Sequence, residues 1–314
     1  MPAKYLKTAV LSAVALIVLG AVALVEHRQS AARKASRIAA AAAEPEAANV
    51  PEPRWRLISL MPSLTETVCM LGLGDCLIAR SQYCDFPPSV TNLPVVGSYG
   101  NANIEAITRL KPDFVLMPDL DSQSWIHDAL AEFRINHLGY SAISLNDIIG
   151  TVWDLGKRFE AEEQSVLWIA HIEKLLGEAA AAAPETAPKI LFCAGREPGS
   201  LDRIFIAGKG NFYSDIVIKC GGVNAYDGDL HSPMISAEGV MLMNPDIIVD
   251  VLVGSSKTEV RKAIDDWSRL TAVNAVKSAD VHILTDSWAV RPGPRIGILV
   301  ETAAEYIKEW AEKK

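Results

Sequence analysis

The chain lacks the sequence patterns that commonly mark catalysis. Its 314 residues contain no Gly-x-Ser-x-Gly nucleophile elbow and no Gly-x-x-x-x-Gly-Lys-Ser/Thr phosphate loop. Gly208-Lys209-Gly210 is a lone glycine pair, which is more typical of a turn than of a nucleotide site. The six histidines show no His-x-x-x-His spacing, although a metal site assembled from distant segments would leave no such trace. We therefore expect no enzyme activity, no cofactor and no metal site.

Positive charge is scarce as well. The chain has 30 Lys and Arg residues against 38 Asp and Glu, which gives a formal net charge of −8. No basic stripe is interleaved with aromatic residues. Because nucleic-acid phosphates demand clustered Lys and Arg, we expect no nucleic-acid partner. The acidity instead indicates a well-solvated surface.

One long uncharged run, Thr8–Val25, lies near the N-terminus behind Lys4 and Lys7. It has about the length that a helix needs to cross a hydrocarbon core. A secretory signal usually has a shorter apolar region and ends in small residues, and Ala21-Val22-Ala23 offers such a cleavage site. We expect residues 1–28 to be an uncleaved signal anchor that spans the membrane with residues 8–25. A cleaved signal peptide is the alternative.

The charges around this run predict the location of everything that follows it. Positive charge stays on the cytoplasmic side, which places the chain after Val25 in the periplasm or otherwise outside the cytoplasm. No Cys follows the run closely, so bacterial-type lipidation at a mature N-terminal Cys is not available. Residues 29–53 are rich in Ala, Glu and Pro without apolar periodicity, and they predict a tether. A helix packed on the next domain is disfavoured because no large apolar residue would anchor it.

The cysteines give no sign of a redox or zinc centre. The five residues include no Cys-x-x-Cys pair, and their odd number leaves at least one thiol free in an exported chain. Cys69, Cys193 and Cys220 lie in apolar contexts typical of buried small side chains. A disulfide between Cys76 and Cys84 is left open by the sequence.

The folded part begins with a strand predicted at Arg56–Leu60. A helix follows, for which Ser63 and Glu66 have the spacing of a capping box. Further on, two segments that start at Glu105 and Glu238 share one pattern. In both, the Glu is followed at the same spacing by a Pro-Asp pair, and the apolar positions agree. Each copy predicts a helix, a Pro-Asp turn and a buried strand. Two copies are too few for a solenoid and indicate two similar α/β lobes.

A long helical pattern lies between the two copies. Apolar residues from Leu145 to Leu176 recur at steps of three and four, and the pattern ends at Pro184. We expect one connecting helix over residues 144–184, roughly 50 Å long at 1.5 Å per residue, although a helix within a core is the alternative. The resulting boundaries are an N-terminal α/β lobe over 54–143 and a C-terminal α/β lobe over 185–314.

Several ordered motifs resemble one family. Two groups of segments are similar to the first and second lobes of periplasmic vitamin B12-binding proteins, within the iron-siderophore/B12 type of ABC-transporter binding protein. The first group is Arg56–Leu60, Pro62–Glu66, Tyr83–Pro88, Gly97–Asn101 and Glu105–Asp113. The second is Gly221–Asn224, Glu238–Asp246 and Thr285–Ile296, which contains Arg291-Pro-Gly-Pro-Arg295.

The resemblance implies two α/β lobes joined by one rigid helix, with the ligand in a cleft between them. It implies an extracytoplasmic solute-binding protein, expected to be a monomer, that captures a corrinoid and delivers it to an ABC permease and its ATPase. Binding of a ferric siderophore, haem or a metal ion is the alternative within the family. A membrane-anchored sensor and an exported hydrolase are the alternatives from other classes.

The resemblance also assigns residues. Glu105 and Glu238 match the positions that dock on the two transporter subunits, although a Glu at a helix start is favoured electrostatically in any case. The ligand-contacting positions fall on Tyr83, Tyr99, Ser287, Trp288, Ala289, Val290 and Arg291. The chain departs from the B12 pattern at Ser232 and Pro118, where aromatic residues can stand, and Cys220 has no partner in the last helix. The alternative for Trp288 and Arg291 is a core residue and a surface ion-pair partner.

Overall fold

The computed structural model describes residues 54–98, 100–120 and 124–314. The predicted anchor and tether, residues 1–53, lie outside these residues, and so does Tyr99. Among the helices in the described part of the chain, none combines the length and the apolar character needed to cross a membrane.

The first lobe is built on a four-stranded parallel sheet with the order β2-β1-β5-β6. Its core packs Ile58 of β1 and Val115 of β5 against Ile107 of α3, and all three side chains are buried. The strands are β1 (Leu57–Ser59), β2 (Leu77–Arg80), β5 (Phe114–Pro118) and β6 (His137–Tyr140), with β3 (Gly97–Ser98) and β4 (Asn101–Ala102) as a separate antiparallel pair. The helices are α2 (Pro62–Met70), α3 (Ile104–Leu110) and α4 (Ser124–Glu132), with short 3-10 turns η1 (Gly74–Cys76) and η2 (Pro88–Asn92).

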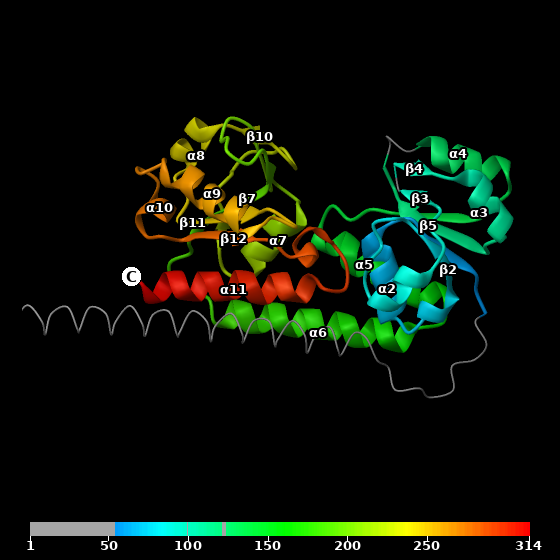
Figure 1. Cartoon of the computed structure of the whole chain (residues 1–314). Coiled ribbons are helices and arrows are strands. Elements are labelled where there is room, and N and C mark those ends of the chain that lie inside the picture. The colour runs from blue at the N-terminus through cyan, green and yellow to red at the C-terminus, as the bar shows by residue number, and fades with distance from the viewer. Residues whose placement is uncertain (1–53, 99, 121–123) are drawn as a thin grey trace, which may run out of the picture. The chain divides into compact units, whose positions relative to one another are not determined.

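The second lobe contains a six-stranded sheet with the order β10-β8-β7-β11-β12, and β9 also pairs with β7. Strands β9, β7, β11 and β12 are parallel, whereas β8 and β10 run antiparallel to their neighbours. The strands are β7 (Lys189–Arg196), β8 (Ile204–Ile206), β9 (Val223–Asn224), β10 (Met234–Ile235), β11 (Ile247–Val251) and β12 (Val281–Leu284). The helices are α7 (Phe212–Lys219), α8 (Ala237–Met243), α9 (Lys257–Ser268), α10 (Asn274–Lys277) and α11 (Ile296–Glu312), with the 3-10 turn η4 (Ser287–Val290). Figure 1 shows the two lobes and the helices beside them.

The two sequence copies adopt the same local structure, which confirms the prediction of two similar α/β lobes. The C-cap residues that follow α3 and α8, Lys111 and Asn244, both have a φ of 48°. The Asp of each Pro-Asp pair then accepts a hydrogen bond from the backbone N–H at the entry to the neighbouring strand. The distances are 2.8 Å from Arg56 to Asp113 and 3.0 Å from Lys189 to Asp246. These bonds set β5 beside β1 in one lobe and β11 beside β7 in the other.

The prediction of one connecting helix is wrong, because the segment forms two helices, α5 (Leu145–Arg158) and α6 (Glu162–Ala181). The chain turns at Glu160, whose φ is +59°, after Phe159 has packed against the rings of Trp55 and Phe114. Gly156 then lies so close to α6 that a Cβ on it would come within 2.6 Å of Ser165. Because Phe159 continues the apolar stripe, the periodicity gave no sign of the break. Helix α6 alone spans about 30 Å.

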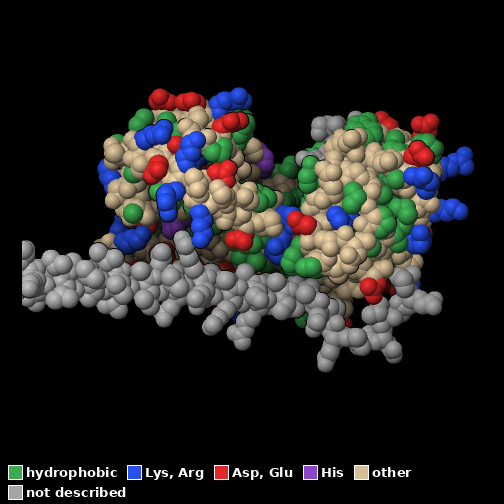
Figure 2. Space-filling view, in the orientation of Figure 1, with side chains coloured by type: hydrophobic (Ala, Val, Ile, Leu, Met, Phe, Trp, Pro, Cys, Tyr) green, Lys and Arg blue, Asp and Glu red, His purple; other side chains and the backbone are tan. Residues whose placement is uncertain are grey.

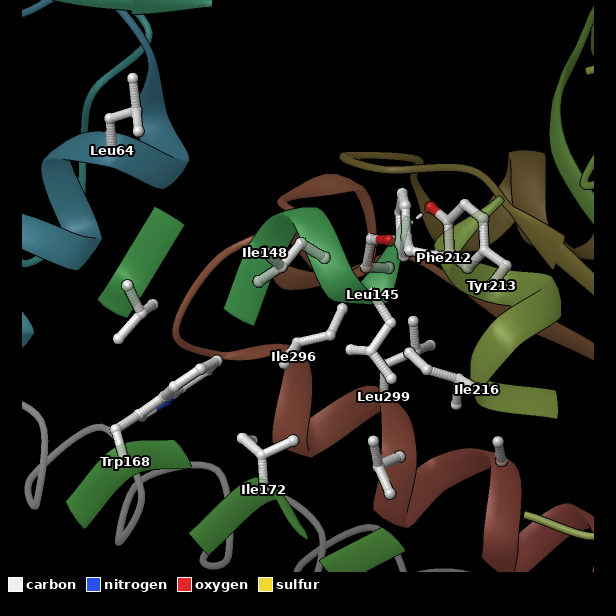
Figure 3. Packing of buried hydrophobic residues seen from close by; sticks show 14 of the residues in the cluster. Leu64, Leu145, Ile148, Trp168, Ile172, Phe212, Tyr213, Ile216, Ile296 and Leu299 are labelled. Atoms are coloured by element: carbon white, nitrogen blue, oxygen red, sulfur yellow. Dashed lines mark hydrogen bonds between the residues drawn. The ribbon is translucent and has the colours of Figure 1, made fainter. Parts of the chain in front are cut away.

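One hydrophobic core joins the two lobes. It contains residues from both sheets and from the helices packed beside them, with Leu64 on α2, Ile148 on α5, Trp168 on α6, Ile216 on α7 and Leu299 on α11. Figure 3 shows Ile148, Leu299 and Ile216 close together, with Trp168 below them and Leu64 on α2 at the edge of the view. Rotating one lobe against the other would therefore expose apolar surface.

All five cysteines are free thiols, including Cys76 and Cys84, whose pairing the sequence left open. Cys84 lies within 3.1 Å of the Ser81 hydroxyl. Cys193 and Cys220 are buried as expected, and Cys69 is partly buried. Burial raises the pKa of Cys69 and of Cys220 to about 12, so these thiols stay protonated and unreactive at neutral pH.

Candidate ligand site and docking surfaces

The predicted ligand-site residues that the structure describes follow the carboxyl ends of parallel strands. Tyr83 lies after β2 with 51% of its surface exposed, and Trp288 and Arg291 lie in or just after η4, which follows β12. Loops at the carboxyl ends of strands in α/β sheets are the usual place for ligand contacts. The guanidinium of Arg291 reaches the first lobe, where Nη2 lies 3.5 Å from the backbone oxygen of Tyr83. The structure therefore brings these two predicted residues together from opposite lobes.

The other residues of the predicted segment point in different directions. Ala289 is fully buried, and its carbonyl oxygen accepts a hydrogen bond from the hydroxyl of Tyr213 on α7. Trp288 is partly buried and packs against the shared core, whereas Val290 is exposed. The segment thus anchors itself in the core through Ala289 and offers Val290 and part of Trp288 to the surface.

Arg291 is part of an ion cluster between the lobes. Its Nη1 donates to Glu66 of α2 at 3.2 Å and to Asp85, in the loop after β2, at 2.5 Å. Arg295 donates to both oxygens of Glu66, at 2.8 and 2.7 Å, and its guanidinium lies 4.2 Å from the centre of the Phe86 ring. The hydrogen bond from Arg291 is the largest influence on Asp85 and lowers the pKa of that carboxyl. In this structure Arg291 is therefore an ion-pair partner between the lobes, with its side chain 12% exposed rather than at the surface as the alternative interpretation had it.

Glu66 does not have the capping role that the sequence suggested. Helix α2 begins at Pro62 with Met61 as its N-cap, and no side chain caps it. Both Ser63 and Glu66 are buried, and Glu66 is 2% exposed because it faces the two arginines. The Arg-Pro-Gly-Pro-Arg motif is visible in the sequence, but its partner Glu66 is not, because Arg295 and Glu66 lie 229 positions apart.

The segment between the two arginines fits closely against both α2 and α6. A Cβ on Gly293 would lie 3.0 Å from the Cβ of Ser63, and the carbonyl of Pro294 accepts a hydrogen bond from the indole of Trp168 at 2.9 Å. A small pocket of about 10 Å³ lies here, lined by α2, α5, the end of β6, Pro292 and Gly293. It has room for about one water molecule, so it is part of the lobe junction rather than a site for a broad ligand.

The two predicted docking residues occupy equivalent positions. Glu105 and Glu238 are each the second residue of their helix, α3 and α8, and both are exposed as expected. Glu105 pairs loosely with Arg109 at 3.9 Å. Glu238 accepts a hydrogen bond from the Ser236 hydroxyl at 2.6 Å, which lowers the pKa of its carboxyl. Both side chains are thus available to a basic partner.

The described residues contain no cluster of three or more His, Cys, Asp or Glu side chains arranged to hold a metal ion. The rings of His127 of α4 and His137 of β6 pack edge to face, with centres 5.0 Å apart. On the face shown in Figure 2, Lys and Arg side chains are interspersed with Asp and Glu.

Comparisons with known proteins agree with this architecture. The sequence model of a family described as "Periplasmic binding protein" matches residues 57–287. Proteins named vitamin B12-binding protein from Pectobacterium atrosepticum and Vibrio vulnificus are each 28% identical to this chain. The alignments cover 81% and 83% of this chain and 88% and 93% of those proteins.

Solved structures have the same fold. The periplasmic vitamin B12 binding protein BtuF of Vibrio cholerae superposes with a TM-score of 0.69 at 26% identity, over 84% of this chain and 100% of that one. The periplasmic heme binding protein HutB of Vibrio cholerae superposes with a TM-score of 0.67 at 19% identity, over 81% of this chain and 98% of that one. The second likeness concerns the fold alone.

Proposed function

Because this chain belongs to the periplasmic binding protein family, we propose that it captures a corrinoid outside the cytoplasm and delivers it to an ABC importer. Membership of a family of binding proteins supports a role in binding rather than catalysis, and a location outside the cytoplasm. The observation that carries the choice of ligand is the set of relatives named for vitamin B12, which align over more than four fifths of the chain.

The side chains at the lobe junction suit a broad ligand that is partly apolar and partly anionic. Tyr83 and Trp288 offer aromatic faces, which give a large contact area with little conformational entropy to lose. Arg291 can form charge-assisted hydrogen bonds to phosphate or carboxylate oxygens. Haem and ferric siderophores combine the same properties, and they are the alternative ligands.

Two partners complete the proposal. Glu105 and Glu238 dock on basic residues of the two permease subunits, because a two-fold transporter requires two equivalent contacts. Residues 8–25 anchor the binding protein, a monomer, in the cytoplasmic membrane. Membrane fractionation with intact-mass measurement tests the anchor, and a soluble form that starts near Glu26 would contradict it.

Calorimetric titration of the purified full chain with cyanocobalamin, haemin and ferric chelates tests the ligand. We expect cyanocobalamin to bind at micromolar concentration or below, and Trp288→Ala to weaken that binding by about 2 kcal/mol or more, as loss of an aromatic anchor does. If haemin binds tightly and cyanocobalamin does not bind, haem rather than a corrinoid is the ligand. Failure of all probes to bind the folded protein would overturn the ligand class.

A further inference from the structure

Arg291 contacts two carboxylates of the first lobe that are held very differently. Glu66 is 2% exposed, and both of its oxygens are bonded by Arg295. Asp85 is 59% exposed and lies in a loop, with Oδ1 on Nη1 of Arg291. Separating Glu66 from the arginines would break a buried ion pair, which carries a large cost in free energy. The Asp85 side chain is already largely hydrated, so it can rotate away from Arg291 into the solvent at a small cost. Of the two partners, Asp85 is therefore the exchangeable one.

The charges of the cluster show what the removal of Asp85 would leave behind. Two carboxylates, Glu66 and Asp85, balance the two guanidinium groups of Arg291 and Arg295. Since Arg295 and Glu66 neutralise each other through two hydrogen bonds, the charge of Arg291 is balanced mainly by Asp85. The Arg291 side chain is only 12% exposed, so water compensates it poorly. Without Asp85, this position would favour another anion.

We propose that Asp85 is an internal competitor for Arg291, which an anionic group of the ligand must displace, while Glu66 and Arg295 keep the guanidinium in place. The inference rests on the proposed function, because it requires that Arg291 contacts the ligand. It also assigns Asp85 a role in specificity. A tethered carboxylate has a high effective concentration and outcompetes small free anions. A broad ligand also contacts Tyr83 and Trp288, and these added contacts let its anionic group displace Asp85 from Arg291.

The first test uses two corrinoids that differ in charge at one end. Cyanocobalamin carries a phosphodiester, whereas cobinamide lacks both the phosphodiester and the nucleotide. We expect Asp85→Asn to tighten cyanocobalamin binding by about tenfold and to leave cobinamide binding unchanged. Asp265→Asn, which removes the same charge from an exposed position on α9, is the matched control and should change neither affinity.

The second test requires no corrinoid. Melting temperatures are measured in sodium phosphate and in sodium chloride at equal ionic strength. In the Asp85→Asn variant phosphate should fill the vacated place beside Arg291 and raise the melting temperature, because binding to the folded state stabilises it. The wild-type protein and the double variant Asp85→Asn, Arg291→Gln should show only the smaller, common rise that phosphate, an anion excluded from protein surfaces, gives folded proteins in general.

The outcomes separate the inference from the function on which it rests. Selective stabilisation by phosphate with no corrinoid binding would retain the anion site and overturn the proposed ligand. Weaker cyanocobalamin binding in Asp85→Asn would show that Asp85 positions Arg291 instead of competing for it. A phosphate-induced rise in Asp85→Asn no larger than that of the wild-type protein, together with an unchanged ratio of the two corrinoid affinities, would overturn the inference.

Discussion

At the scale of single residues, Glu66 is the carboxylate on which the junction depends. Its removal leaves two guanidinium groups facing each other with Asp85 as the remaining carboxylate of the cluster. Breaking a buried pair in this way costs about 3–5 kcal/mol of folding free energy. We expect that loss for Glu66→Gln in urea unfolding. Glu160→Gln removes an exposed pair with Arg54 and should cost less than about 1 kcal/mol. Equal losses of unfolding free energy in Glu66→Gln and Glu160→Gln would contradict the claim that burial makes the Glu66 pair the more important of the two.

His282 makes the stability of the second lobe depend on pH. It stacks on Tyr306 at 3.7 Å, and its Nε2 finds no hydrogen-bond partner among the described residues. Burial lowers the pKa of His282 to about 4, against 6.5 in the unfolded chain, although nearby Asp280 opposes this and Lys313 adds to it. The folded state therefore disfavours the proton, and stability present above pH 6.5 is lost as the pH falls toward 4.

The predicted loss is about 2 kcal/mol between pH 7 and pH 5. Urea unfolding at both pH values measures it. His282→Phe keeps a ring against Tyr306 but does not titrate, so its stability should change less over the same interval. If the variant and the wild-type protein lose the same amount, the pH dependence comes from other groups.

Residue-scale inference from the sequence was limited by distance along the chain. The Arg-Pro-Gly-Pro-Arg motif was visible, but Glu66 was interpreted as a local cap because Ser63 stands three positions before it. Nothing local shows that Arg295 reaches Glu66 across the fold. The Pro-Asp pairs, in contrast, repeat at one offset, so the turn between helix and strand could be predicted in each lobe, although the bond from each Asp to the neighbouring strand could not.

At the scale of elements, α3 and α8 are expected to dock on the permease. Charge reversal at Glu105 or Glu238 to Lys would set like charges against basic groups of the transporter. Uptake by cells with the cognate permease should collapse, while ligand affinity in titration stays unchanged. Glu173→Lys, at an exposed position on α6, is the control and should transport normally. Loss of ligand binding in Glu105→Lys would place that residue in the ligand site.

The turn between α5 and α6 depends on a glycine at the helix contact. A methyl group on Gly156 would lie 2.6 Å from Ser165 and 3.0 Å from the backbone oxygen of Ala161. Gly156→Ala should therefore destabilise the protein by about 1–3 kcal/mol, as overpacking does. Gly177→Ala on α6, where a methyl group meets nothing within 4 Å, should instead stabilise it by up to about 1 kcal/mol. Thermal unfolding of both variants distinguishes crowding from helix propensity.

The break between these helices marks the limit of sequence patterns at this scale. Apolar periodicity reports which side chains face a core, and Phe159 faces the core whether or not the helix continues. The signals of the turn are the positive φ of Glu160 and the packing of Gly156 on Ser165, which depend on tertiary contact. Strand β1 could be placed because its apolar residues lie between clear boundaries.

At the scale of the whole molecule, the shared core and the ion cluster restrict movement between the lobes. The same hydrophobic cluster contains Leu116 of the first sheet and Val249 of the second, together with α6 and α11. A large rotation would expose these apolar residues and separate Glu66 from Arg295, and both changes are unfavourable. Saturating cyanocobalamin should therefore change the radius of gyration in X-ray scattering by less than about 1 Å. Glu66→Gln removes one restraint and should permit a larger change. A contraction of several ångströms in the wild-type protein would show that the lobes close about a hinge despite their common core.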